Sequence, residues 1–522
     1  MATVSGPERK DSTPHDTSGT RRAARGGVAN LIGAGYSGIA SFAVTALVAR
    51  IATTSDAGVY FSALSVLLIA ASLVELGVPV GFVYFLARYR GLGRTDLLRK
   101  ALTAGAVPML VLGVIVATVG VVFRDQLGRV FFSDAVTDRA GIMAIISITL
   151  VFLIVTDSVM GATRGLGVMR PTVIADKFVN PTVQLLALVL LAGAGWTGGD
   201  QMIWTRTVGV TAVAILIIPW LRRLLRRYPR RAEETLSQAW APKRKIIGEF
   251  WRFTGPRALG QIAQVGIQRV DVVLVALWLG PVDAAVYAAA TRFLVFGQLA
   301  ANAIGTAVQP QISALTARGA RAPLQHLYRT STAWVMFATW PFYLTFIVQA
   351  HWLMRLFGNQ YERGALVLQI LSAAMLIATS CGAVDAVLLM AGRSTWTMIN
   401  AWVALIVNVG LNIWLIPQMG ILGATIAWVA SILVNNLVPL VQVAVGIRVH
   451  PFGRITLSAA ITPLILFGLL PWVVSLTRAG VWGAAGALVL GVAVYLPLLW
   501  RWRHTLELTE ILRRRERRAS AE

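Results

Sequence analysis

Polar side chains recur along the apolar stretch 253–280 with the spacing of one helix face. They follow one another at steps of four, three, four and three residues: Arg257, Gln261, Gln264, Gln268 and Asp271. On an α-helix, these side chains stay within about 40° of one line. In a membrane-spanning helix such a row would be costly against lipid, so we expect it to face a watered cavity.

The next apolar stretch, 284–312, carries a second polar face. Its members stand at steps of seven, four and seven residues: Thr291, Gln298, Asn302 and Gln309. Milder rows occur earlier in the chain: Asn30, Ser37, Ser41 and Thr45, then Ser65, Ser72 and Glu75. For the small residues the alternative is hydrogen bonding between helices inside a packed bundle.

The elements that carry these rows are transmembrane helices. Hydrophobic residues make up 57% of the 522 residues and charged residues only 13%, against roughly 25% in soluble domains. Segments near the ~20 residues needed to span a bilayer recur along the chain. We expect fourteen: 27–49, 58–86, 101–123, 140–163, 172–195, 201–221, 253–280, 284–312, 327–349, 364–391, 395–417, 420–446, 455–477 and 479–500. The sequence therefore predicts an all-α polytopic membrane protein.

The net charge of +24 indicates topology rather than nucleic-acid binding. Arginine and lysine concentrate in cytoplasmic loops, and the basic clusters at 88–100, 222–231, 243–245 and 513–518 share one side if both termini are cytoplasmic. The seven arginines of the opposite connections are matched by seven acids. We expect a multi-pass protein of the inner (cytoplasmic) membrane, with its basic side near anionic lipid headgroups. Residues 1–26 lack the apolar core of a signal peptide.

An internal repeat relates the two halves of the chain. The sequence DAGVY at 56–60 returns as DAAVY at 283–287, an offset of 227 residues. Asp157 then matches Asp385, and Asn180 matches Asn408, with a slip of one residue. Six spans per copy predict a parallel repeat, with the substrate path between the copies. The expected parts are a disordered tail at 1–26, an N-lobe at 27–221, a basic linker at 222–249, a C-lobe at 250–446, two further helices at 447–502 and a basic tail at 503–522.

Two motifs carry a family resemblance that covers about 27–500. The segment DAAVYAAATRFLVFGQLAANAIGTAVQPQISAL, which begins at Asp283, has the Tyr…Arg…Pro-x-x-Ser pattern of polysaccharide-export flippases. GILGATIAWVAS at 420–431 resembles the twelfth helix of the same group, the multidrug/oligosaccharidyl-lipid/polysaccharide superfamily. The resemblance implies two six-helix lobes around a central cavity, two extra helices, and a substrate of polyprenyl-diphosphate-linked oligosaccharide.

Differences from the patterns of particular families indicate which branch of the superfamily this chain resembles most. Drug/cation antiporters of the superfamily normally stop at twelve helices, whereas this chain has fourteen expected spans. Lipid II flippases share fourteen helices and an arginine in the eighth, matched here by Arg292, but they also carry arginines in the first helix. Segment 27–49 holds none. A general polysaccharide or cell-wall glycan flippase fits best, with the drug/cation antiporter kept as an alternative.

The chemistry of such a substrate assigns roles to the polar rows. A diphosphate needs cations at membrane depth, and arginine can bind phosphate with two parallel hydrogen bonds. We expect Arg257 to receive the diphosphate from the cytoplasmic side and Arg292 to engage it as the outer side opens. Glutamine and asparagine side chains suit sugar hydroxyls; the candidates are Gln261, Gln264, Gln268, Gln298 and Asn302, with Glu75 beside them. Arg269, about 120° from the polar row, is more simply a structural ion pair, although substrate binding stays open.

Three acids are candidates for coupling or gating. Asp157 and Asp385 stand seven or eight residues before Arg164 and Arg393, and we expect structural or gating partners there, with proton coupling as the alternative. Asp271 matches part of the sodium site of lipid II flippases, together with Asn408, Asn412 and Thr425. Pairing of Asp271 with Arg269 or another arginine is the simpler expectation.

A membrane-embedded glycosyltransferase or polymerase is the alternative from another class. Such enzymes need carboxylates or histidines on sizeable external loops, whereas the five histidines here are scattered. No phosphate-binding glycine loop, zinc spacing or nucleophile triad occurs, and Cys381 is alone. We therefore expect no enzyme activity and no cofactor; the partners are membrane lipids, the lipid-linked substrate and glycan-assembly enzymes.

Overall fold

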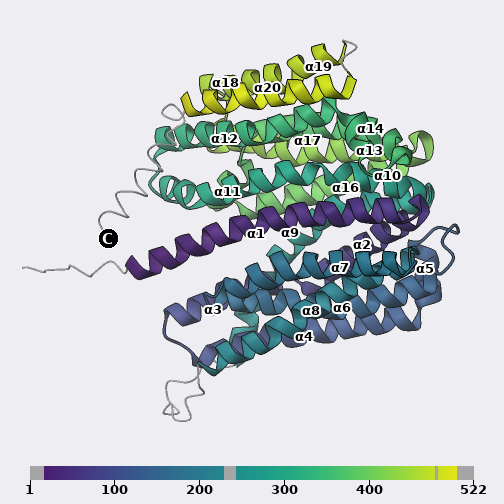
Figure 1. Cartoon of the computed structure of the whole chain (residues 1–522). Helices are drawn as coiled ribbons and strands as arrows, with labels where there is room; N and C mark the ends of the chain where they lie inside the picture. Colours follow the sequence, from purple (N-terminus) through teal and green to yellow (C-terminus); the bar gives the residue numbers. More distant parts are fainter. Residues whose placement is uncertain (1–16, 228–242, 477–479, 502–522) are drawn as a thin grey trace, which may run out of the picture.

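The structure, a computed structural model, describes residues 17–227, 243–476 and 480–501, and is helical in two layers with a third, thinner layer at one edge (Figure 1). Within these residues, thirteen helical stretches are long and apolar enough to cross a membrane, and a shorter apolar helix covers Ala485–Arg501. The all-α polytopic fold is therefore confirmed. Residues 1–16, most of the linker and the tail from 503 lie outside the described residues.

The first layer is the N-lobe. It contains α1 (Thr17–Ile51), α2 (Thr54–Glu75), α3 (Val78–Gly91), α4 (Asp96–Val122), α5 (Arg124–Phe131), α6 (Arg139–Gly165), the π-helix η1 (Thr172–Val179), α7 (Asn180–Gly193) and α8 (Gly199–Arg226). The first helix begins at Thr17, ten residues before the expected boundary at residue 27. The expected span 58–86 divides at Leu76 and Gly77, where φ is +47° and +70°.

The second layer is the C-lobe, and the last helices pack on its edge. The C-lobe contains α9 (Lys243–Trp278), α10 (Pro281–Arg292), α11 (Leu294–Ala317), α12 (Arg321–Val348), α13 (Ala350–Arg355), the 3₁₀ helix η2 (Asn359–Gly364), α14 (Ala365–Ser380), α15 (Val384–Met390), α16 (Ser394–Met419) and α17 (Ile421–Gly446). Against α12 lie α18 (Arg454–Pro463) and the π-helix η3 (Leu464–Leu469), followed by α19 (Leu470–Ser475) and α20 (Gly480–Arg501).

The two ends of the bundle differ, and we name them by the chain. The start of α1, the end of α8, the start of α9 and the end of α20 lie together at the linker end (Figure 1). The starts of α2 and α10 lie at the opposite, turn end. This arrangement requires an even number of crossings, as the sequence predicted.

At the turn end the lobes are in direct contact through the repeated sequence. Helix α2 packs along α10, and a Cβ atom added at Gly58 would lie 1.7 Å from the carbonyl oxygen of Pro281. Arg50 of α1 also donates a hydrogen bond of 2.8 Å to the carbonyl of Leu356 in the other lobe. DAGVY and DAAVY therefore help to form one closure between the lobes.

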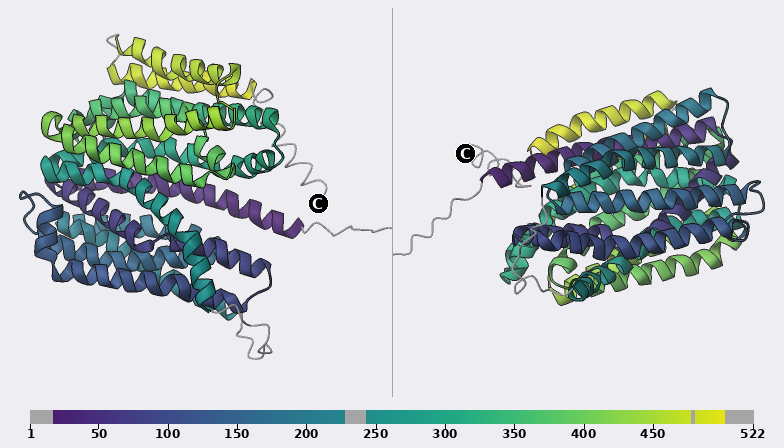
Figure 2. Two further views of the ribbon diagram at one scale, coloured as in Figure 1. Left: turned by 180° about the vertical axis from the view of Figure 1, so that it is seen from behind. Right: turned by 90° about the horizontal axis from the view of Figure 1, so that it is seen from below.

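Helix α9 connects the lobes over its whole length (Figure 2). It packs against α16, α10 and α17 of the C-lobe and against α2, α3 and α4 of the N-lobe. The ring of Phe250 lies against Phe82 and Phe85, at a point where Gly81 and Gly105 leave room for it. Pro256 removes one backbone hydrogen bond near the middle of this helix.

Candidate translocation site

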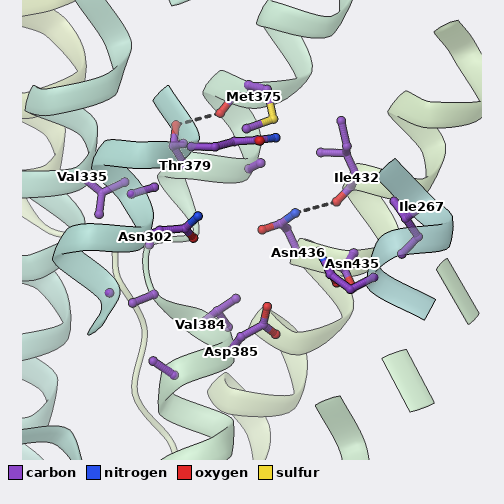
Figure 3. A pocket seen from close by; sticks show the side chains of 18 of the residues that line it. Ile267, Asn302, Val335, Met375, Thr379, Val384, Asp385, Ile432, Asn435 and Asn436 are labelled. Atoms are coloured by element: carbon purple, nitrogen blue, oxygen red, sulfur yellow. Dashed lines mark hydrogen bonds between the residues drawn. The ribbon is translucent and has the colours of Figure 1, made fainter. Parts of the chain in front are cut away.

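A polar pocket of about 330 Å³ opens inside the C-lobe. Five side chains expected from the polar rows line it: Gln264, Gln268, Gln298, Asn302 and Gln309. Asn435 and Asn436 of α17 add to the polar lining. Figure 3 shows Asn302, Asn436 and Asp385 pointing into the same space from three helices. We call this space the C-lobe pocket.

Arg257 lies at the mouth of this pocket, on the side of the linker end. A second space of about 380 Å³ includes Arg257 and shares Gln264 and Asp385 with the C-lobe pocket. The guanidinium carbon of Arg257 stands 3.8 Å from the ring centre of Phe253, and its Nη1 donates to the carbonyl of Phe253 over 3.1 Å. Arg257 has no carboxylate within 4.0 Å among the described residues, so its charge is available to a ligand.

Arg292 belongs to a different group, deep between the lobes. Arg292 and Arg206 are both neighbours of Arg269 and of Tyr60. The three arginines come from α8, α9 and α10, and each side chain is half-buried. We call Arg206, Arg269 and Arg292 the arginine cluster.

No carboxylate within 4.0 Å neutralises the arginine cluster in the part of the chain that the structure describes. Arg206 Nη1 donates to Asn180 Oδ1 over 3.2 Å, while its Nε is buried without a partner. The expectation that Arg269 forms a structural ion pair is therefore wrong. Keeping unpaired cations away from bulk water costs several kcal/mol each, which an anionic ligand would offset.

Glu75 does not reach the C-lobe pocket. It is 7% exposed, at the end of α2, and its neighbour is Asp157 of α6. Two carboxyl groups can hydrogen-bond to one another only if one of them carries a proton. A coupling role for Asp157, with one proton held by the pair, stays a prediction.

Asp271 lies at the centre of a buried hydrogen-bond cluster in the C-lobe. Its Oδ2 accepts a hydrogen bond of 3.0 Å from the hydroxyl of Tyr287, and its Oδ1 accepts one of 2.8 Å from Asn412. Asn412 also donates to Oδ1 of Asn408 over 3.2 Å. The simpler expectation, an Asp271–Arg269 pair, is wrong, because Asp271 uses neutral donors and forms no ion pair among the described residues.

The cluster around Asp271 fits a cation only in part. Asn412 Oδ1 is buried without a hydrogen-bond partner and could be a ligand beside the carboxylate. Thr425 is fully buried, and its hydroxyl donates to the carbonyl of Ile421 over 2.8 Å. Within the described residues, no group of three or more His, Cys, Asp or Glu side chains could hold a metal ion.

Asp385 and Arg393 are not partners. Arg393 Nη2 donates to the carbonyl of Gly446 over 3.4 Å, and Asp385 has neither a hydrogen bond nor an ion pair among the described residues. The Asp385 side chain is exposed to water, although the pocket walls surround it.

The remaining expected side chains do not join these groups. Gln261 is exposed and lines neither space. In the N-lobe, the hydroxyls of Thr45, Ser65 and Ser72 donate to carbonyls of their own helices, which satisfies them without a ligand. The side chain of Asn30 lies outside the described ones.

Sequence reasoning missed Arg206. The residue was visible as the one charged residue of segment 201–221, five residues from its start. It follows no polar row, because its neighbours on the helix are apolar or small. A lone arginine at membrane depth is itself a sign of function, and that sign could have been used.

The structure is thus a two-lobed helical membrane fold with a polar pocket in its C-lobe. The chain is similar in fold to the lipid II flippase MurJ in an inward closed conformation, with a TM-score of 0.70 and 13% identity over 91% of this chain and 99% of the other. An inward-facing multidrug resistance MATE family transporter has a TM-score of 0.63 and 15% identity, over 82% of this chain and 96% of the other. A MOP superfamily transporter from Pyrococcus furiosus has a TM-score of 0.56 and 16% identity, over 82% of this chain and 95% of the other.

The family follows from the sequence itself. The family model described as polysaccharide biosynthesis protein matches residues 23–316, more than half of the chain, and a second model, MatE, matches residues 256–414. No curated protein sequence matches. The chain belongs to the polysaccharide biosynthesis protein family, within the MOP superfamily of membrane flippases and transporters. The resemblance stated from the motifs is thereby confirmed, and transport rather than enzyme activity is the function of these families.

Proposed function

We propose that the protein translocates a polyprenyl-diphosphate-linked oligosaccharide or cell-wall glycan precursor across the cytoplasmic membrane by alternating access. The arginine cluster is the observation that carries this proposal. Three half-buried cations without a carboxylate partner suit a ligand with two negative charges. A cationic drug would be repelled by the same cluster, which disfavours the antiporter alternative.

The route follows from the two ends of the bundle. With the lobes in contact at the turn end, substrate enters from the linker end, where Arg257 lies at the mouth of the C-lobe pocket. The diphosphate then moves from Arg257 to the arginine cluster, while the sugars occupy the amide-lined space. The prenyl tail stays in lipid. Separation of α2 from α10 releases the substrate at the turn end.

This route requires the linker end to face the cytoplasm. Short tags at the N-terminus, at the C-terminus and within 228–242 should then be inaccessible to a membrane-impermeant reagent in intact cells. Tags in the turns at 51–57 and 281–283 should react. Reaction of the linker tag from outside would reverse the direction of transport and remove the proposal.

The test of the proposed function is flipping in reconstituted vesicles. A polyprenyl diphosphate that carries a short oligosaccharide is placed in one leaflet, and its arrival in the other is followed with an impermeant glycosidase. We expect Arg269→Ala to lose one charge-assisted contact, worth about 1.5–3 kcal/mol, and therefore to bind substrate roughly ten- to a hundredfold more weakly. Arg269→Lys should recover only part, because lysine lacks the planar fork.

Arg321→Ala is the matched control, because Arg321 is exposed at the start of α12 and lies outside the site. It should flip substrate at the wild-type rate. Equal rates for Arg269→Ala, Arg257→Ala, Arg292→Ala and the control would contradict the proposal. Protein abundance and melting temperature, measured on the same samples, separate a folding defect from a binding defect.

A further inference from the structure

The C-lobe pocket has an unusual charge for a carrier of an anionic substrate. Among the residues that the structure describes, Asp385 is the only ionisable side chain that lines it. Arg257 reaches only the neighbouring mouth, where it is stacked on Phe253. The arginine cluster lines neither space. The cationic and acidic parts of the route are therefore separate sites.

The backbone holds Asp385 in the pocket. Helix α14 ends at Ser380, the chain turns at Gly382 with φ +65°, and α15 begins at Val384. A Cβ atom at Gly382 would lie 2.0 Å from the hydroxyl of Thr332, so only glycine fits this turn. The break between two helices thus fixes the position of the carboxylate, which a continuous helix would not.

The polar neighbours of Asp385 are free to bind a ligand. The amides of Gln264, Gln268, Gln298 and Asn302 make no hydrogen bond to protein within the described part of the chain. Amides both donate and accept, whereas a carboxylate only accepts. Hydroxyl groups can satisfy all of them, and the carboxylate can accept from two at once. Trp428, also in the wall, offers an apolar face to the carbon side of a sugar ring.

The size of the pocket fits a small part of a glycan. Its volume of about 330 Å³ lies at the lower end of small-molecule sites, roughly 300–1,000 Å³. The mouth adds about 380 Å³. The pocket therefore suits the first sugars next to the diphosphate rather than a whole oligosaccharide or a prenyl tail.

We propose that the C-lobe pocket binds the sugars next to the diphosphate and that Asp385 makes it selective for neutral or amino sugars over acidic ones. This inference rests on the proposed function. A uronate in the pocket would place a second negative charge beside Asp385 with no cation in the wall to offset it. An amino sugar would gain an ion pair. Asp385 is then a specificity-determining residue rather than a gate.

The experiment uses the full-length protein in detergent and four soluble ligands. These are a short-chain prenyl diphosphate without sugar, and the same diphosphate esterified to glucose, glucosamine or glucuronic acid. Binding is measured by titration calorimetry. We expect the wild type to bind the glucuronic acid compound at least about tenfold more weakly than the glucose compound, and the glucosamine compound at least as tightly as the glucose compound.

Two variants separate the effect of the charge of Asp385 from the effect of the shape of the C-lobe pocket. Asp385→Asn should narrow the difference between the glucuronic acid and glucose compounds to less than about threefold. Asn302→Leu should weaken all three sugar compounds equally and keep the discrimination. Asp125→Asn, an exposed acid on α5, is the control and should behave as the wild type.

The outcomes distinguish this inference from the proposed function. If the prenyl diphosphate binds but all three sugar compounds bind with equal affinity, the selectivity assigned to Asp385 is wrong and the flippase proposal survives. If the sugar compounds also bind no more tightly than the sugar-free diphosphate, the glycan pocket is wrong as well. Unchanged discrimination in Asp385→Asn would also overturn the inference. If no diphosphate compound binds, both fail together.

Discussion

The N-lobe and the C-lobe carry the same polar frame at equivalent positions, with opposite charges. The equivalent residues are Tyr60 and Tyr287, Asn180 and Asn408, and Gln184 and Asn412, at offsets of 227 or 228 residues. In the N-lobe, Gln184 donates to the hydroxyl of Tyr60 over 2.7 Å, and the charge beside the frame is Arg206. In the C-lobe, the hydroxyl of Tyr287 donates to Asp271.

The charged members do not come from equivalent positions. The repeat places Leu433 opposite Arg206 and Val44 opposite Asp271. The uncharged frame is thus common to both copies, and each copy has its own ion. The repeat therefore supplies two similar frames of opposite sign: the N-lobe frame borders the arginine cluster, and the C-lobe frame holds the carboxylate of Asp271.

Reversing the charge of the N-lobe site should have the largest effect. Arg206→Glu gives that frame the sign of the C-lobe frame and places a carboxylate where we propose the diphosphate binds. Like-charge contacts cost several kcal/mol, so flipping in vesicles should fall by more than about a hundredfold. The flipping rate of Arg206→Gln should fall less than that of Arg206→Glu. Equal flipping by both variants and the wild type would remove the distinction between the two lobes.

Weakening the contact between α2 and α10 at the turn end should have the second largest effect. Gly58 corresponds to Ala285 in the repeat, yet Gly58→Ala places its Cβ against the carbonyl of Pro281. Overpacking costs about 1–3 kcal/mol, which would shift the population away from the closed turn end by roughly five- to a hundredfold. Accessibility of a cysteine introduced at Ala285, which is buried in α10, with Cys381 replaced, measures the shift. The same accessibility with and without Gly58→Ala would show that this contact does not close the path.

The negative charge of Asp271 in the C-lobe can be tested through the dependence of the flipping rate on sodium ions. We expect sodium ions to speed flipping by the wild type and Asp271→Asn to remove that response, because the amide keeps the shape of the site but not its charge. Asp125→Asn is the control. Sodium-independent flipping by the wild type would exclude a cation at Asp271.

In the N-lobe, we expect the carboxyl groups of Asp157 and Glu75 to hold one proton between them. Asp157 corresponds to Asp385, but it faces Glu75, whereas Asp385 faces the C-lobe pocket. We predict that a pH gradient changes the flipping rate of the wild type and of Asp385→Asn, but not that of Asp157→Asn. An equal response of Asp157→Asn would make the Glu75–Asp157 pair structural.

The two tyrosines give the smallest and most closely matched comparison. Tyr287→Phe removes a hydrogen bond to a carboxylate, worth about 1.5–3 kcal/mol of unfolding free energy, whereas Tyr60→Phe removes one between neutral groups, worth about 0.5–1.5 kcal/mol. Chemical unfolding in detergent measures both. A larger loss for Tyr60→Phe would contradict the assigned charge asymmetry.

The sequence alone predicted the helices and the internal repeat better than the partners of the charged side chains. Hydrophobic length and the 227-residue offset reflect local physics, so the helices and the repeat could be read directly. The polar row of segment 253–280 gave Gln264 and Gln268 of the C-lobe pocket for the same reason. The partners of Arg269 and Asp271 could not be found this way, because they lie on helices whose rotation is set by packing.

The central claim is that the diphosphate binds at the arginine cluster. Electron cryomicroscopy of the protein with a short-chain prenyl diphosphate, in the conformation that is closed at the turn end, tests it most directly. We expect density for the diphosphate in contact with Arg206, Arg269 and Arg292. Diphosphate density beside Asp271 or within the C-lobe pocket, with the arginine cluster empty, would contradict it.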